Sequence, residues 1–314
     1  MGKISFLGGI PVLFGFYVSI LVVVPIFYEI PVYSYPLLVS LLVIFVYGLG
    51  DDLLNYKPWK KLVFQLLVSS IIVYKCNIYI CMSEVFPGLK LSEPFCIGIQ
   101  IVVIASIINA YNLIDGSDGL TALLSLIGSL TYGLLFYLDR QYFESAMAIA
   151  LAGALIGFIF YNLPPACVFM GDACSTFLGL AFGYFTFKYL NSGGSSSALS
   201  TSNRSIIAFS IVSVPVLDLV RLFVFRLIKG KNPFRGDVNH IHHLLIQSGF
   251  SKMHVVVILS SIQLFFIFAA CMLMKSLVSV FISFSIIWYI GFVVFVNKYY
   301  ISKKEKKKQF NLNS

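Results

Sequence analysis

Charged residues are scarce in this chain of 314 residues: only 11% are Asp, Glu, Lys or Arg, whereas 59% are hydrophobic. A soluble domain carries about a quarter charged residues, so this composition excludes an ordinary water-soluble enzyme. Heptad repeats, internal repeats and long polar tracts are lacking as well, which excludes a coiled coil and a disordered chain. The apolar residues come in long runs instead, and the mean hydropathy of +0.92 indicates a membrane protein.

Cysteine is also infrequent, and the six cysteines follow no metal-binding spacing. Cys76, Cys81 and Cys96 are expected near the outer face, where a disulfide is one interpretation and small apolar helix residues are the simpler one. A secretory signal is lacking too, because the apolar run that begins at Phe6 is too long and has no convincing cleavage site. The cysteines therefore give no evidence of a metal centre.

Apolar stretches of roughly the length of a membrane helix follow one another along the chain. They cover residues 6–28, 36–50, 61–82, 96–113, 119–138, 142–162, 172–190, 205–228, 254–275 and 277–297. Because one crossing needs about 20 apolar residues, the sequence predicts an all-α, polytopic integral membrane protein with about ten transmembrane helices. Residues 1–298 then form a single transmembrane catalytic domain, and residues 299–314 form a basic cytoplasmic tail.

The formal net charge of +9 comes from 22 Lys and Arg residues against 13 Asp and Glu residues. Much of the excess lies in the segment 229–235 and in the tail 303–308. Basic loops beside membrane helices are typical of the cytoplasmic side, so this placement favours membrane lipid over nucleic acid as a partner. Counting loops alternately puts the segments 51–61, 113–119 and 163–172 on that same face, where most of the notable polar residues then gather.

The first polar motif is Asp51-Asp52, which closes an apolar stretch. Adjacent carboxylates repel each other, and both stay ionised most easily beside a cation such as Mg²⁺. The alternative is that they cap the next helix and simply end the span.

The second motif places four polar residues three apart: Asn109, Asn112, Asp115 and Asp118. If the helix continues through them, all four lie along one edge, which would be costly if it faced lipid. A turn would explain the Asp-Gly-Ser-Asp-Gly portion but not the two asparagines. The motif therefore favours a cavity or a bound ligand.

A third motif runs from Asn162 through Pro164-Pro165 and Phe169 to Asp172. The prolines end one helix, and Asp172 opens another, so Asp172 is either a helix cap or a metal ligand near a helix N-terminus. The dipole of such a terminus also attracts phosphate.

The fourth motif is a loop with Arg235 and three histidines, His240, His242 and His243. Zinc is disfavoured because the His-x-His-His spacing lacks cysteine, and the carboxylates elsewhere suit Mg²⁺. Histidines among basic residues can contact a pyrophosphate or donate protons, and a chance cluster on a solvated loop is the alternative. Together the four motifs indicate phosphoryl transfer from a nucleotide compound to a lipid. A transporter is the rival interpretation, but no matching halves are found.

In these motifs the chain resembles the polyprenyl-phosphate N-acetylhexosamine-1-phosphate transferases, that is, glycosyltransferase family 4. The resemblance is carried by Gly-Asp51-Asp52, Asn109-x-x-Asn112-x-x-Asp115-Gly-x-Asp118-Gly, Phe169-Met-Gly-Asp172 and His240-Ile-His242-His243, in this order. The His-Ile-His-His form is similar to the undecaprenyl-phosphate N-acetylglucosamine-1-phosphate transferase branch, which is related to the phospho-N-acetylmuramoyl-pentapeptide translocase. Two positions depart from the family pattern: Asn55 replaces a third Asp, and Cys174 replaces a Gly.

The resemblance implies a bacterial inner-membrane enzyme whose active site faces the cytoplasm. Its substrates would be a UDP-N-acetylhexosamine and undecaprenyl phosphate, its cofactor Mg²⁺ with Mn²⁺ as the alternative, and its product the start of a surface polysaccharide. The implied roles fall into three groups: Asp172 as metal ligand; Asp51, Asp52, Asp115, Asp118, His242 and His243 in catalysis; Asn109, Asn112, Asn162, Phe169, Arg235 and His240 in substrate binding. The sugar, the polymer, and whether the chain forms a homodimer stay open.

Overall fold

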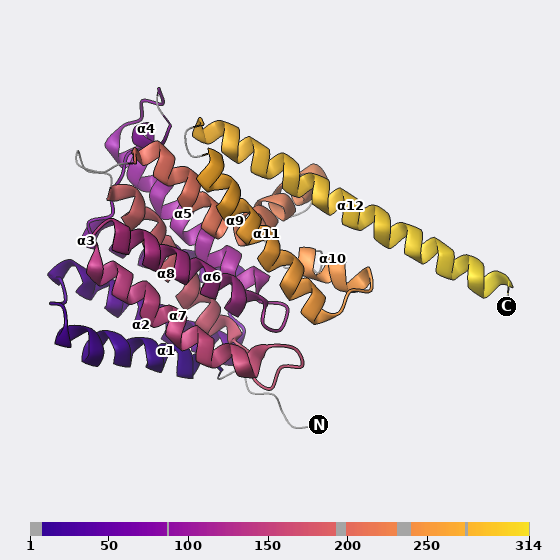
Figure 1. Cartoon of the computed structure of the whole chain (residues 1–314), viewed down its shortest axis with the longest axis horizontal. Coiled ribbons are helices and arrows are strands. Elements are labelled where there is room, and N and C mark those ends of the chain that lie inside the picture. Colours follow the sequence, from indigo (N-terminus) through magenta and orange to yellow (C-terminus); the bar gives the residue numbers. More distant parts are fainter. Residues whose placement is uncertain (1–7, 87, 193–198, 231–239, 274–275, 314) are drawn as a thin grey trace.

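The structure is a computed structural model that describes residues 8–86, 88–192, 199–230, 240–273 and 276–313 (Figure 1). These residues form a bundle of helices, and no strand occurs among them. Arg235, one of the predicted substrate-binding residues, lies outside the described residues. The elements are α1 (Gly9–Val18), η2 (Ser19–Val23), η3 (Val24–Ile26), η4 (Val32–Ser34), α2 (Tyr35–Leu54), α3 (Pro58–Lys75), α4 (Met82–Val85), α5 (Glu93–Ile114), α6 (Leu120–Leu138), α7 (Tyr142–Asn162), α8 (Gly171–Asn191), α9 (Thr201–Ile228), α10 (Ile241–Gln247), α11 (Lys252–Leu273) and α12 (Val278–Asn313).

Eight helical segments within the described ranges are long and apolar enough to cross a membrane. The protein is therefore an all-α, multi-pass membrane protein, as the sequence predicts. Two of the ten expected stretches, 61–82 and 172–190, instead give α3 and α8, which are not among these eight. Lysines at both ends of α3 lower its hydropathy, whereas α8 is surrounded by protein and has little need of an apolar surface.

Helix α8 lies at the centre of the bundle and is buried along nearly its whole length. It packs against α2, α5 and α9, and glycines let two of these contacts come close. A Cβ on Gly48 of α2 would lie 2.5 Å from the Cα of Ala173, and one on Gly179 of α8 would lie 2.5 Å from the Cα of Ile108. The hydrophobic effect does not drive helix association in lipid, so helices pack there through van der Waals contact, which small residues permit by letting the backbones come close.

Polar contacts gather at two opposite ends of the bundle. At one end Lys188 of α8 lies 3.2 Å from the carboxylate of Glu144, to which the Tyr33 hydroxyl donates a hydrogen bond of 2.7 Å. Sixteen residues earlier on α8, Asp172 belongs to the other end, about 24 Å away along the helix axis. This separation approaches the thickness of a hydrocarbon core, so α8 connects the two polar ends.

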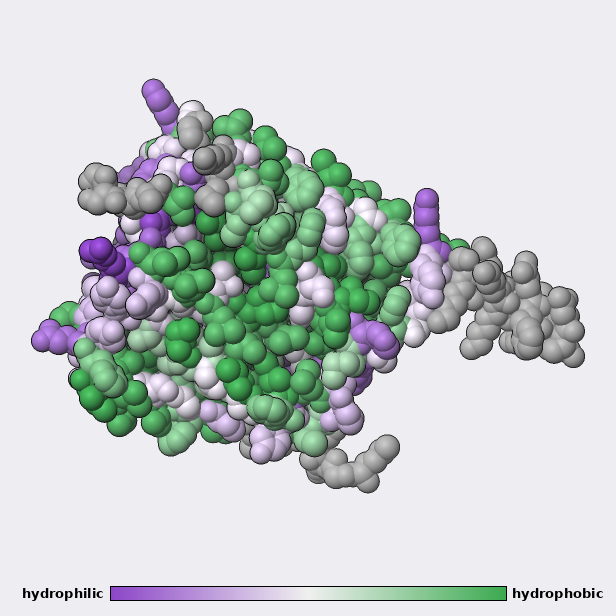
Figure 2. Space-filling view, viewed as in Figure 1, coloured by the Kyte–Doolittle hydropathy of each residue, from purple (hydrophilic) through white to green (hydrophobic). Residues whose placement is uncertain are grey.

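The surface between these ends is predominantly apolar. Figure 2 shows hydrophobic residues across most of the visible face, with hydrophilic residues towards its left and right margins. Helix α12 extends away from the bundle as one continuous helix to Asn313, so the predicted boundary at residue 298 falls inside it (Figure 1).

Candidate active site

The end of α2 shapes the first part of the site. Asn55 adopts a left-handed backbone with φ of 50°, which closes the helix and turns the chain back towards Asp51. The Tyr56 backbone N–H then donates a hydrogen bond of 2.8 Å to Oδ1 of Asp51, which is only 4% exposed. Asparagine tolerates the left-handed region better than most residues, so the departure from the family pattern at this position suits the local backbone.

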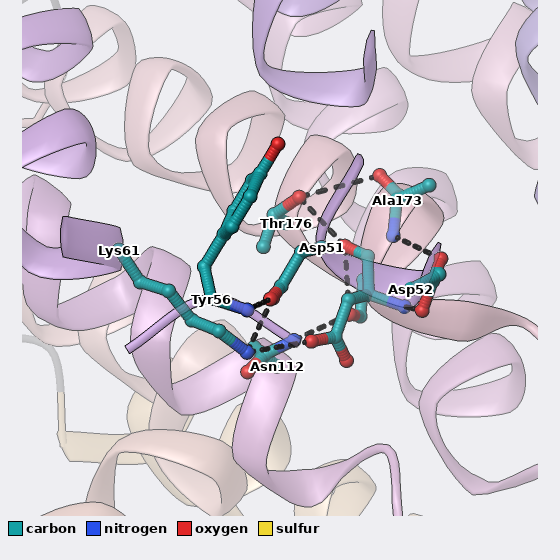
Figure 3. Close-up of polar contacts among 9 residues, drawn as sticks. Asp51, Asp52, Tyr56, Lys61, Asn112, Ala173 and Thr176 are labelled. Atoms are coloured by element: carbon teal, nitrogen blue, oxygen red, sulfur yellow. Dashed lines mark hydrogen bonds and ion pairs between the residues drawn. The ribbon is translucent and has the colours of Figure 1, made fainter. Parts of the chain in front are cut away.

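Lys61 is the central cation of the site, although it belongs to none of the four sequence motifs. Its ammonium, from the first turns of α3, forms an ion pair with Asp51 (Figure 3). The same ammonium lies 2.9 Å from Oδ2 of Asp172. One positive charge thus joins two carboxylates from α2 and α8. The only signal in the sequence was a lysine at the edge of a long apolar stretch.

Asp52 has a different role from its neighbour. Its two carboxylate oxygens accept the backbone N–H groups of Asp172 at 2.8 Å and Ala173 at 3.2 Å. These groups are unpaired donors at the N-terminus of α8, where the helix dipole favours a negative charge. Asp52 therefore caps α8 from another helix, and Figure 3 shows it beside Ala173, with Asp51 nearer to Lys61.

The prediction that four polar residues share one helix edge is only half right. Helix α5 ends at Ile114, so Asn109 and Asn112 lie on the helix, whereas Asp115 and Asp118 lie in the turn that follows. Asp115 leaves the helical region with ψ of 41°, and Gly119, with a positive φ of 78°, ends the turn before α6 begins.

Residues on both sides of that turn make polar contacts with other helices of the site. Asn112 donates a hydrogen bond of 3.1 Å to the Ser175 hydroxyl on α8, and Asp118 lies 2.9 Å from the ammonium of Lys252. Burial raises the pKa of the Asp115 carboxyl well above its ordinary value, and the neighbouring carboxylates, first among them Asp172, raise it further. Asp115 therefore holds its proton more tightly than an ordinary aspartate.

Asn162 joins the Asp115–Gly119 turn to the loop between α7 and α8. It is 4% exposed, its Oδ1 accepts the Gly119 N–H at 3.0 Å, and its Nδ2 donates to the carbonyl of Val168 at 2.9 Å. Both ends of the amide are engaged inside the protein, so Asn162 holds the loop to the turn, and its substrate contact stays a prediction. Phe169 is half-buried in the loop that Asn162 holds.

The histidine motif is buried more deeply than the solvated loop that the sequence suggested. His240 is 4% exposed and precedes α10, and His242 on its first turn is fully buried. Within the described residues neither ring nitrogen of His242 has a hydrogen-bond partner. Burial lowers the pKa of His242 to about 3, so the ring is neutral at pH 7 and can bind a phosphate through hydrogen bonds only. Burial lowers the pKa of the more exposed His243 as well.

Gly116 brings the second and fourth motifs together. A Cβ on this residue would lie 2.3 Å from Nε2 of His242, so the imidazole rests directly on the turn. We expect Gly116→Ala to lower turnover about tenfold or more, because a buried ring cannot move aside without displacing α10. Steady-state kinetics of the purified variant would measure this.

Gly98→Ala is the matched control, since a Cβ there has nothing within 4 Å. Equal turnover of the two alanine variants would show that the contact between His242 and the turn is unimportant.

The chemistry of the site suits a hard divalent cation. Asp51, Asp52, Asp115, Asp118 and Asp172 supply five carboxylates, against the lysines Lys61 and Lys252. No group of three or more His, Cys, Asp or Glu side chains among the described residues lies close enough to hold a metal alone. Mg²⁺ usually binds through one or two carboxylates and completes its shell with waters and substrate phosphates, so the donor set fits that ion.

A family model described as glycosyl transferase family 4 matches residues 34–189, which include the first three motifs. The chain belongs to glycosyl transferase family 4.

Curated members of the family cover most of the chain. The undecaprenyl-phosphate alpha-N-acetylglucosaminyl 1-phosphate transferase of Escherichia coli O157:H7 is 28% identical over 265 residues, covering 82% of this chain and 70% of the relative. That of Yersinia pestis is 29% identical over 265 residues, with the same shares. The probable undecaprenyl-phosphate N-acetylglucosaminyl 1-phosphate transferase of Bacillus subtilis is 28% identical over 263 residues, covering 82% of this chain and 68% of the relative.

In this member of family 4 the structure brings Asp51, Asp52, Asn112 and Asp172 together around Lys61. It brings His242 to the Asp115–Gly119 turn through Gly116. Asn109 has no recorded polar partner among the described residues and is half-buried on α5.

Proposed function

We propose that the protein transfers an N-acetylhexosamine-1-phosphate from a UDP-sugar to undecaprenyl phosphate, releases UMP and so starts a surface polysaccharide. The names of the relatives reported above support undecaprenyl phosphate as the acceptor and an N-acetylhexosamine-1-phosphate as the transferred group. The observation that carries the proposal is the contact of Lys61 with Asp51 and Asp172 at one end of a membrane bundle. An ammonium group among carboxylates is the kind of group that can bind a phosphate. A transporter would place such groups near the bilayer midplane.

In this reaction an oxygen of the lipid phosphate attacks the sugar-proximal phosphorus of the donor. The bond from that phosphorus to the bridging oxygen breaks, and UMP leaves with the electron pair. Both substrates are anions and must enter a site rich in carboxylates. Lys61 would exchange its carboxylate partners for phosphate oxygens, and Asp51, held by Tyr56, would orient the lysine and the lipid phosphate.

We propose Mg²⁺ as the cofactor, with Mn²⁺ as the alternative, and Asp172 with Asp51 as the residues that hold it. An ion bound there would neutralise part of the negative charge on the donor diphosphate. The more exposed His243 would hydrogen-bond the diphosphate oxygens, and the buried His242 beside it would hold this part of α10 against the turn. Phe169 would stack on the base from its loop beside α8.

The proposed cellular setting is the bacterial inner membrane, with the site facing the cytoplasm. The basic segments 229–235 and 303–308 support that side, and UDP-sugars are cytosolic compounds. The second polar end, around Glu144 and Lys188, would then face outward.

The test is an assay with purified protein in nanodiscs, undecaprenyl phosphate, Mg²⁺ and UDP-N-acetylglucosamine labelled in the sugar. We expect the sugar label to become extractable into organic solvent and UMP to be released in an equal molar amount. Release of UDP instead of UMP, or label that stays in the aqueous phase with every UDP-N-acetylhexosamine tried, would contradict the proposal. Uptake of intact donor into sealed proteoliposomes would favour a transporter.

A further inference from the structure

Asp218 is a buried aspartate on α9 that belongs to none of the sequence motifs. It is 1% exposed, and its Oδ2 lies 2.9 Å from Nδ1 of His240. Its Oδ1 accepts hydrogen bonds from Arg221 Nη2 at 2.8 Å and Nε at 3.1 Å, and from the Tyr289 hydroxyl at 3.3 Å. The backbone N–H of Ile241 donates to the same oxygen at 3.3 Å. One carboxylate thus joins α9, α12 and the start of α10.

The charge beside Asp218 decides which atom carries the hydrogen. Arg221 is always protonated, so its partner carboxylate is ionised and can only accept. The hydrogen between Asp218 and His240 therefore lies on Nδ1 of the imidazole. A neutral His240 is fixed in the Nδ1–H form, and Nε2 becomes the nitrogen with a lone pair.

The start of α10 depends on the same carboxylate. His240 is the residue before the helix, and its side chain makes no capping hydrogen bond. The first N–H groups of a helix need an acceptor, and Asp218 supplies one to Ile241 from a different helix. If Asp218 served only to neutralise Arg221, neither contact with the α10 segment would be needed.

From His240 the contacts lead directly to the site. The His240 and His242 rings are stacked, with centroids 5.6 Å apart and planes at 10°. His242 lies 4.2 Å from His243, centroid to centroid, and its Nε2 rests against Gly116 of the turn. The position of each of these rings follows from where α10 begins and how His240 is turned.

We propose that Asp218 is a positioning residue, which fixes the tautomer of His240 and anchors α10 so that His242 stays against the Asp115–Gly119 turn. It acts through His240 and does not touch the substrate. Its kinetic consequence rests on the proposed function, whereas its effect on the imidazole does not.

The direct test is the tautomer of His240, measured by nitrogen NMR of protein labelled in its four histidines. His240→Ala assigns the signal. We expect the wild-type ring to be protonated at Nδ1, and Asp218→Asn to give a mixture of both tautomers. A wild-type His240 protonated at Nε2 alone would overturn the proposal, even if the Asp218 variant did not fold.

The kinetic test is a double-mutant cycle. Asp218→Asn should lower kcat about 10–100-fold with little change in KM. In the His240→Ala background the same substitution should cause almost no further loss of kcat. Asp139→Asn is the matched control, because it removes a carboxylate paired with buried Arg204 at the opposite end of the bundle. Additive losses in the cycle, or an equal loss of kcat in the control, would reduce Asp218 to a structural role. A wild-type protein without transfer would refute the proposed function alone, since the NMR result stands independently.

Discussion

Asp172→Asn is expected to reduce turnover about 10³-fold or more while leaving the protein folded. The amide is neutral, so it is a poor partner for both Lys61 and a divalent cation. The backbone N–H of residue 172 still donates to Asp52, so the start of α8 is preserved. The measurement is the initial rate of lipid labelling across a Mg²⁺ titration, with thermal unfolding followed in parallel.

Asp139→Asn again serves as the control for loss of a carboxylate within the bundle, because Asp139 pairs with Arg204 at the far end. Its turnover should stay close to wild type. Near-normal turnover of Asp172→Asn at limiting Mg²⁺ would exclude Asp172 as the metal-holding residue.

Lys61→Gln should lower turnover about 100-fold and also lower the unfolding temperature. Without the ammonium, the carboxylates of Asp51 and Asp172 face each other with no opposite charge between them. Removing one member of a part-buried ion pair leaves the others uncompensated, which destabilises the fold. Substrate phosphates also lose their cation, so we expect a higher KM for the UDP-sugar together with the lower kcat.

Lys60→Gln is the matched control, since it removes a neighbouring charge on the same turn whose ammonium lies 5.8 Å from the Trp59 ring centroid. This variant should resemble wild type in rate and stability. Equal losses of activity in the two lysine variants would show that positive charge at the start of α3 matters in general and would exclude a specific role of Lys61.

The convergence of Asp51, Asn112 and Asp172 could be predicted from the sequence. Each is a polar side chain at the end of an apolar run, and alternate crossings return such ends to one face. Their separate roles could not be predicted. Asp52 caps α8 only because α2 and α8 approach closely at Gly48 and Ala173, and that contact depends on packing between distant segments.

The burial of the histidines was missed for a related reason. A His-rich segment between basic residues is typical of a solvated loop, yet α10 packs against α11 and α12 and buries His240 and His242. Asp218 could have been found, because a single carboxylate inside an apolar stretch is costly in lipid and indicates a buried partner. The sequence offers Arg221, three residues further on, as one partner, but it could not provide His240, which lies 22 residues along the chain.

The burial of α8 affects how the site responds to its bilayer. One end of the helix is fixed by Asp52 and the other by the pair of Lys188 with Glu144, and almost none of its surface meets lipid. A thinner or thicker membrane therefore acts first on the outer helices, above all α1 and α12, which belong to the least buried of the candidate membrane spans and can tilt. The distance between the two polar ends is set along α8, which is surrounded by protein, so we expect that distance to change little with lipid composition.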